Sequence, residues 1–87
     1  MRIKVKIGNR LGLHARPAMS FVDTAARFRS DIKVSKGSQV VDGKSIMQLM
    51  MLAATQGTEL EIAADGPDAE QAVSTLQQLV ESNFDEE

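Results

Sequence analysis

The chain has 87 residues, of which 43% are hydrophobic and 25% are charged, and its net charge at pH 7 is −2. This length and composition are typical of one globular domain, so we expect residues 1–87 to form a single domain. The slight acidity and the presence of only three aromatic residues argue against nucleic-acid binding, which needs a basic face or stacking platforms. There is no cysteine, no signal peptide is visible, and no apolar run approaches the about 20 residues of a membrane span, so we expect a cytoplasmic protein without disulfides, iron–sulfur clusters or membrane insertion.

The N-terminal part of the chain changes from a period of two to a helical period. Apolar side chains alternate with basic ones over residues 3–7, which predicts a strand with one face in water, as antiparallel sheets allow. A loop with two glycines follows over residues 8–14. The apolar residues after it recur at helical spacing and predict a helix over residues 16–28, with Pro17 in its first turn; they are Ala18, Phe21, Val22, Ala25 and Phe28.

The middle of the chain has the pattern of a β-hairpin. An alternating segment around residues 31–35 is followed by a tight turn at Lys36-Gly37-Ser38 and by a return strand that starts with Gln39-Val40-Val41. Asp42-Gly43-Lys44 then ends the second strand of the predicted hairpin.

A short helix is expected directly after the hairpin. Ser45 is followed three residues later by Gln48, which is the spacing of a capping box at a helix start. The pattern predicts a helix over residues 46–53, and Gln56-Gly57 is expected to stop it.

The C-terminal part predicts one more strand and one more helix. Leu60 and Ile62 alternate with glutamates, and Gly66-Pro67-Asp68 opens the last helix, with Pro67 in its first turn. The acidic end, Asp85-Glu86-Glu87, is expected to fray. The apolar stripe of this helix is Ala69, Ala72, Val73, Leu76, Leu79 and Val80.

The predicted element order is β-α-β-β-α-β-α. An amphipathic sheet must bury its apolar face, and the stripes of the two longer helices are the surfaces available to cover it. We therefore predict the α+β class, as an open-faced two-layer sandwich in which helices cover one face of a four-stranded antiparallel sheet.

The single histidine, His14, stands directly before the first predicted helix. The first amides of a helix are unsatisfied donors at the positive end of its dipole, so they attract anions. Ala15 and Arg16 supply such amides, and the Arg16 guanidinium adds a positive fork suited to phosphate. An imidazole beside them is well placed to hold a phosphoryl group covalently, and the alternative is a surface histidine without a task.

Other chemistry at His14 has less support. Cysteine and a second histidine are absent from the chain, and no nearby carboxylate completes a metal site. The histidine also lacks the Ser-plus-Asp pattern of a hydrolase triad. We therefore expect no metal and no cofactor.

Residues 9–18 and residues 43–49 form two motifs that resemble those of the HPr family of phosphocarrier proteins, which belong to the bacterial phosphotransferase system. Residues 9–18, with the sequence NRLGLHARPA, resemble the active-site signature of the family. Residues 43–49, with the sequence GKSIMQL, resemble its regulatory serine region. The spacing of the motifs, the turn at residues 56–58 and the element order also agree, so the resemblance covers essentially the whole chain.

The resemblance implies a function. Proteins of this family accept a phosphoryl group that originates from phosphoenolpyruvate and is delivered by enzyme I, and they hold it on the δ nitrogen of the histidine. They then pass the group to sugar-specific permease enzymes. The matching residues here are His14 as the acceptor and Arg16 as the phosphate-binding arginine. A carrier of this kind is modified stoichiometrically, so we expect it not to be an enzyme in the strict sense, and we expect a monomer.

Ser45 has a structural and a regulatory interpretation. Serine is a good N-cap, and this alone accounts for it. The resemblance adds that the matching serine is phosphorylated in many bacteria by an HPr serine kinase/phosphatase, which modulates transfer and catabolite control. A phosphate at a helix N-terminus is electrostatically favourable, so the charge would act on a docking partner rather than melt the helix.

The residues after Ser45 suggest a docking surface. A helix this short cannot bury every side, although Leu49 and Leu52 belong to the core in part. Flexible methionines suit a surface that fits several partners. We expect the exposed apolar residues to flank His14, where the family's partner surface also lies; they are Ile46, Met47, Met50 and Met51.

The alternatives concern the branch of the system and the class of protein. Met19, Gly66-Pro67 and the end Phe84-Asp85-Glu86-Glu87 resemble the nitrogen-branch carrier, whereas residues 43–47 resemble the sugar-branch carrier. A regulatory binding module without phosphotransfer is a second alternative, but the variants expected there lack the histidine. A purely structural α+β domain is a third, and it gives no reason for His14 and an arginine to meet at a helix start.

Overall fold

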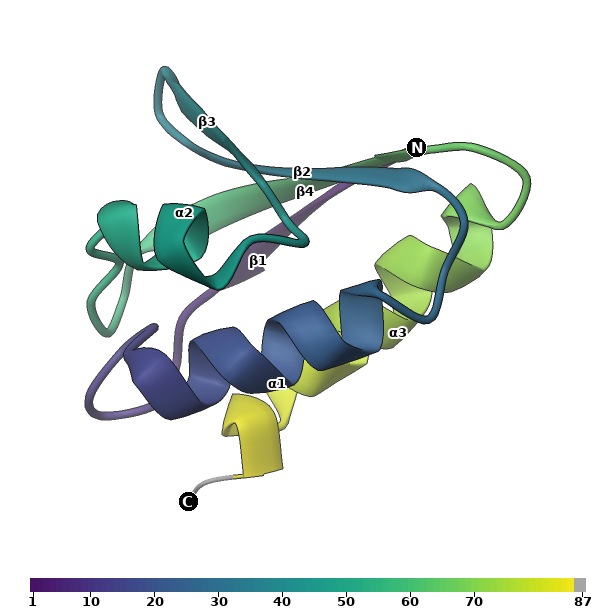
Figure 1. The fold of residues 1–87 in the computed structure, drawn as a ribbon. Helices are drawn as coiled ribbons and strands as arrows, with labels where there is room; N and C mark the ends of the chain where they lie inside the picture. Colours follow the sequence, from purple (N-terminus) through teal and green to yellow (C-terminus); the bar gives the residue numbers. More distant parts are fainter. Residues whose placement is uncertain (86–87) are drawn as a thin grey trace.

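Four strands form one antiparallel sheet in the computed structural model, which describes residues 1–85 (Figure 1). The strands are β1 (Arg2–Lys6), β2 (Asp31–Lys36), β3 (Gln39–Asp42) and β4 (Glu59–Asp65), in the spatial order β1-β4-β2-β3. The helices of the described chain are α1 (Ala15–Ala25), α2 (Ile46–Met51), α3 (Ala69–Glu81) and the 3-10 turn η1 (Asn83–Asp85). The predicted element order is confirmed, with η1 added after the last helix.

Alternation along the strands separates a buried face of the sheet from a face in water. In β4, the side chains of Leu60, Ile62 and Ala64 are buried, and those between them are half-buried. Figure 1 shows α1 and α3 side by side beneath the sheet, with α2 near the start of α1. The open-faced sandwich is therefore confirmed. Its largest fully buried apolar residues include Ile7, Ile32, Val34, Leu49, Leu52, Ile62, Leu76 and Val80.

The outer face of the sheet carries charges. Lys4 and Lys6 of β1 lie opposite Glu61 and Glu59 of β4 in the antiparallel register. Lys33 of β2 lies on the same face and, like the two lysines of β1, it is exposed. Such alternating signs across neighbouring strands favour the pairing of the strands and keep this face in water.

Helix α1 ends earlier than its apolar spacing predicts. It covers Ala15–Ala25 rather than residues 16–28. The amides of Arg27 and Phe28 donate to the carbonyls three residues back, each at 3.1 Å, so the chain tightens into a 3-10-like turn. Phe28 still packs against the core, which explains why it continues the apolar pattern beyond the helix.

Helix α2 is also shorter than predicted. It ends at Met51 rather than at Ala53, ahead of the turn at residues 56–57. The amides of Leu52 and Ala53 each donate to the carbonyl three residues back at 3.1 Å, and Ala53 has a φ of 51°. A left-handed residue terminates an α-helix, so the chain leaves the helix before the glycine predicted to stop it.

Two half-buried lysines bind carbonyl groups near helix ends. Lys36 Nζ donates to the carbonyl of Leu52, the C-cap of α2, at 2.7 Å. Lys44 Nζ donates to the carbonyl of Phe28, in the turn after α1, at 2.8 Å. Cations are favourable at the negative end of a helix dipole, so these lysines stabilise both helix ends.

The start of α3 differs from the prediction, because Pro67 precedes the helix instead of lying in its first turn. The N-cap position belongs to Asp68, whose side chain does not cap its own helix. It accepts hydrogen bonds from the amides of Arg29 and Ser30 at 2.9 and 3.0 Å, and from the hydroxyl of Ser30. These hydrogen bonds join the start of α3 to the connection between α1 and β2, where Ser30 is fully buried.

The Asp68 carboxylate is expected to make stability depend on pH. Its hydrogen bonds, first that from the Ser30 side chain and then that from the Arg29 amide, hold its pKa below the ordinary value. A lowered pKa in the folded state contributes stability above the unfolded-state pKa, and this stability is lost as the pH falls below about 4. Asp68→Asn should therefore lower the melting temperature at pH 7 and approach the wild type in acid.

Melting curves from pH 7 to pH 3 measure this effect. Asp23→Asn, at an exposed carboxylate on α1, is the matched control and should show no such convergence. A melting difference for Asp68→Asn that stays constant over this range would show that the charge of Asp68 is not responsible.

The C-terminal segment folds back onto the helices as η1. Phe84 is buried there with an exposed fraction of 6%. Fraying was predicted for Asp85-Glu86-Glu87, but Asp85 belongs to η1 and its amide donates to the carbonyl of Ser82 at 3.1 Å. Residues 86 and 87 lie outside the described residues.

Candidate functional site

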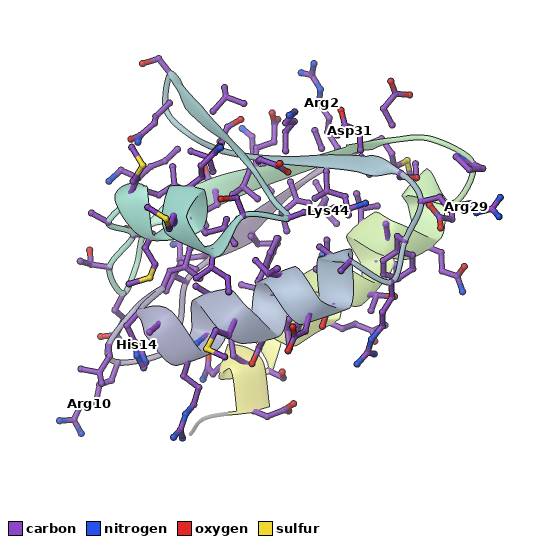
Figure 2. The ribbon with its side chains drawn as sticks, in the orientation of Figure 1. Arg2, Arg10, His14, Arg29, Asp31 and Lys44 are labelled. Atoms are coloured by element: carbon purple, nitrogen blue, oxygen red, sulfur yellow. The ribbon has the colours of Figure 1, made fainter. Side chains whose placement is uncertain are left out.

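His14 is the N-cap residue of α1, as its place before the predicted helix suggests. Its backbone is extended, with φ −83° and ψ −170°, and its carbonyl accepts the amide of Ala18 at 2.9 Å. The imidazole is half-buried and does not cap the amides of the helix. Figure 2 shows His14 at the start of α1, on the loop that also carries Arg10.

The first amides of α1 form an anion-binding end beside His14. Ala15 and Arg16 are the first two helical residues, and both are exposed. Helix geometry gives their amides no carbonyl partner within the helix, and the dipole makes this end positive. Pro17 follows as a buried third residue without an N–H. The structure thus places His14 and the first two amides of α1 at one helix end, with Arg16 as the second residue of the helix.

The loop before His14 is held against the connection that follows α2. The amide of Leu13, a buried residue, donates to the carbonyl of Ala54 at 2.9 Å. The side chain of Asn9 is almost fully buried and donates from Nδ2 to the carbonyl of Gly12 at 2.7 Å. No separate role was predicted for Asn9, although an asparagine in a glycine-containing loop is a common turn signal.

Gly12 is required where the loop meets this connection. Its φ of 70° lies in the left-handed region, and a Cβ atom at this position would collide with the carbonyl oxygen of Ala54. The Gln56 side chain also donates to the carbonyl of Gly8 at 3.0 Å. Contacts within the fold therefore fix the backbone that carries His14.

Ser45 is the N-cap of α2, and this prediction is confirmed. Its hydroxyl oxygen accepts the amide of Gln48 at 3.2 Å. The second half of a capping box does not form, because Gln48 Oε1 accepts the amide of Asp42 at 2.9 Å instead. Gln48 therefore joins α2 to β3, and Ser45 remains half-buried at the helix start.

Four apolar residues of α2 face outward, and we call them the α2 apolar surface. Leu49 and Leu52 are buried on the inner side of the same segment, at 0% and 1% exposure. The exposure of the outer residues agrees with the expectation for a short helix; they are Ile46 (36%), Met47 (78%), Met50 (44%) and Met51 (66%). Figure 1 shows this helix next to the start of α1.

Two further exposed apolar residues lie near His14 in the sequence. Leu11, in the loop before it, is 70% exposed, and Met19, in the second turn of α1, is 52% exposed. No role was predicted for Leu11, and Met19 was noted only for its resemblance to the nitrogen-branch carrier. The loop has two leucines among glycine and polar residues, and only Leu13 of the two is buried. The available signal for Leu11 was therefore a second apolar residue in a short polar loop.

Among residues 1–85, no three histidine, aspartate or glutamate side chains lie together as metal ligands would. Within the same residues, no helix has both the length and the apolar character needed to cross a membrane.

Comparison with known proteins identifies the family. Residues 1–82 match the family model PTS-HPr, described as the PTS HPr component phosphorylation site. The phosphocarrier protein HPr of Neisseria meningitidis serogroup A is 44% identical over 86 residues, which cover 99% of this chain and 97% of that protein.

Two solved structures of HPr from Thermoanaerobacter tengcongensis are each 45% identical to this chain. One, described as HPr-C-His, has a TM-score of 0.96, and the match covers 100% of this chain and 98% of that chain. The other, described as a dimer, has a TM-score of 0.80, with 97% of each chain covered. The chain therefore belongs to the HPr family, the phosphocarrier proteins of the phosphotransferase system.

Proposed function

We propose that His14 accepts a phosphoryl group from phospho-enzyme I and passes it to sugar-permease enzymes of the phosphotransferase system. The position of His14 as the N-cap of α1 carries this proposal, because it sets the imidazole beside the exposed amides of Ala15 and Arg16. In the transfer, the lone pair of Nδ1 attacks phosphorus, an N–P bond forms and the bond to the donor breaks.

The surroundings suit a group that must arrive and leave again. A phosphoryl group carries about two negative charges, which the amides of Ala15 and Arg16 and the Arg16 guanidinium offset. The half-buried imidazole remains open to a partner that approaches from the solvent. The chain acts in this scheme as a stoichiometric carrier within the relay, and not as a catalyst.

The test is a direct search for the adduct. The protein is mixed with enzyme I and phosphoenolpyruvate, and the modified residue is identified by peptide mass mapping. An adduct at His14 that is labile in acid and stable in base is the expected result. A stable adduct at another residue, or none in the presence of active enzyme I, would contradict the proposal.

The α2 apolar surface is proposed to dock enzyme I. A docking surface needs apolar area that a partner can cover, and four exposed apolar residues on one short helix supply it. The Leu13–Ala54 hydrogen bond ties the end of this region to the loop of His14, so a partner on α2 is also near the imidazole. Flexible methionines allow the same surface to fit the permease enzymes in turn.

Ser45 is proposed as the site of regulation by a serine kinase/phosphatase. Ser45→Ala removes the cap and should cost about 1 kcal/mol of stability. Ser45→Asp should retain the helix, because a carboxylate is favourable at a helix N-terminus, and should raise the KM for enzyme I. The added charge would lie next to Ile46 and Met47, where it must lose water on docking.

Thermal melting and the KM for enzyme I separate the two roles of Ser45. Near-normal melting of Ser45→Asp with a raised KM supports regulation at this site. An unchanged KM would leave Ser45 as a helix cap only.

The proposed carrier is a cytoplasmic monomer. One solved HPr is described as a dimer, so the state of this chain needs its own measurement. Sedimentation velocity at the concentrations of the transfer assay should show one species of monomer mass, and a dimer under these conditions would contradict this part of the proposal.

A further inference from the structure

Every methionine side chain of this protein reaches the surface. The chain has five methionines, and their exposed fractions range from 44% at Met50 to 78% at Met47. Methionine is usually a filler of cores, but the buried apolar residues here are aliphatic residues and phenylalanine. All the thioethers are therefore on side chains that a small solute can approach.

Three of the five methionines share one face of α2. Met50 and Met51 lie three and four residues after Met47, so the side chain of Met47 is a neighbour of both on the helix surface. Figure 2 shows sulfur atoms, in yellow, beside α2 and on α1. Leu49 and Leu52 hold the opposite side of this segment in the core. A chemical change at the outer sulfurs therefore does not require the core to open.

The composition leaves the thioether as the preferred target of mild two-electron oxidants. The chain contains no cysteine, no tryptophan and no tyrosine. A peroxide thus meets no thiol that would react first, and sulfoxide formation is the expected outcome.

We propose that Met47, Met50 and Met51 form a reversible oxidation site that takes one oxygen atom each from a peroxide. The sulfur lone pair attacks a peroxide oxygen, the S–O bond forms and the O–O bond breaks. Hydrogen peroxide is thereby reduced to water, and the sulfur gives up two electrons. Methionine sulfoxide reductases return the thioether, with electrons from thiols.

Oxidation at this site would weaken docking. A sulfoxide is polar and binds water, so a partner that covers the α2 apolar surface must remove that water without supplying equivalent hydrogen bonds. This consequence rests on the proposed docking of enzyme I. The modified chain should fold normally and should lose affinity for enzyme I rather than reactivity at His14.

The experiment compares the protein before and after treatment with hydrogen peroxide. Peptide mass mapping should find sulfoxides at Met47 and Met51 before Met50, in the order of exposure. The melting temperature should change little, the KM for enzyme I should rise about tenfold and the rate at saturation should be retained. Sulfoxide reductases should restore the original KM.

Two variants locate the effect. The triple variant Met47→Leu, Met50→Leu, Met51→Leu has no thioether on α2. Its KM for enzyme I after peroxide treatment should equal its KM before the treatment. Met19→Leu keeps the three methionines of α2 and should stay as sensitive as the wild type. Full sulfoxide formation with an unchanged KM, or equal sensitivity of the triple variant, would overturn the proposal.

The two proposals fail in different ways. An untreated chain that accepts no phosphoryl group from active enzyme I refutes the proposed function, and the docking consequence falls with it. The oxidation site itself is then decided by the mass map and the melting curve. Sulfoxides that form at α2 in the folded chain and are removed by the reductases support it, and resistance of these residues to peroxide refutes it.

Discussion

Replacing His14 by alanine is expected to abolish phosphoryl acceptance from enzyme I and to leave the fold intact. The chain has one histidine, so no other imidazole can take over the group. Backbone contacts of residue 14 and contacts of Asn9, Gly12 and Leu13 help to hold the loop, and the variant retains them. The free energy of unfolding should therefore change by less than about 1 kcal/mol.

Mass spectrometry after incubation with enzyme I and phosphoenolpyruvate measures the effect of His14→Ala. The unphosphorylated mass should be the only one present, at a melting temperature close to that of the wild type. Any phosphoryl adduct formed by this route on the variant would show that another residue accepts the group. Loss of the folded state would instead show that the imidazole has a structural role.

The second large effect is expected for Arg16. Hydrogen bonds to charged groups contribute about 1.5–3 kcal/mol each, so the loss of the guanidinium should lower kcat/KM for phosphoryl transfer about 100-fold. Arg16 is exposed, and the main-chain geometry at the start of α1 does not depend on its side chain. Melting of Arg16→Ala should therefore stay within about 0.5 kcal/mol of the wild type.

Two further variants separate charge from geometry at Arg16. Arg16→Lys keeps the charge but lacks the planar fork, so its transfer rate should be intermediate. Arg27→Ala removes the same charge from an exposed arginine beyond the far end of α1, and it should transfer normally. Equal losses for Arg16→Ala and Arg27→Ala would reduce the role of Arg16 to general electrostatic attraction.

The order of the elements and the layer architecture could be predicted from the sequence because they depend on periodicity. The strands and α3 each bury one face, and the apolar residues of the sequence recur at the spacing of that face. The pattern alone therefore shows which side chains meet the core. The ends of α1 and α2 were predicted too late. Their last turns tighten into 3-10-like geometry, and apolar side chains such as Phe28 remain in the core beyond the helix.

Contacts between distant segments could not be predicted in the same way. Asp68 binds Ser30 across 38 residues, and its sequence position suggests only a helix cap. Gly12 needs its conformation because of the carbonyl of Ala54, which only the folded chain brings near. The candidate site was easier to find, because His14, Ala15 and Arg16 are consecutive in the sequence.

The distribution of the amino groups determines how the protein can be attached to a surface. The amino group of Met1 and the Nζ atoms of Lys36 and Lys44 each donate to a main-chain carbonyl. The remaining lysines are exposed on the outer face of the sheet; they are Lys4, Lys6 and Lys33. An amine-reactive dye or biosensor chip should therefore couple at this face. The captured chain would present His14 and the helices to a partner in solution.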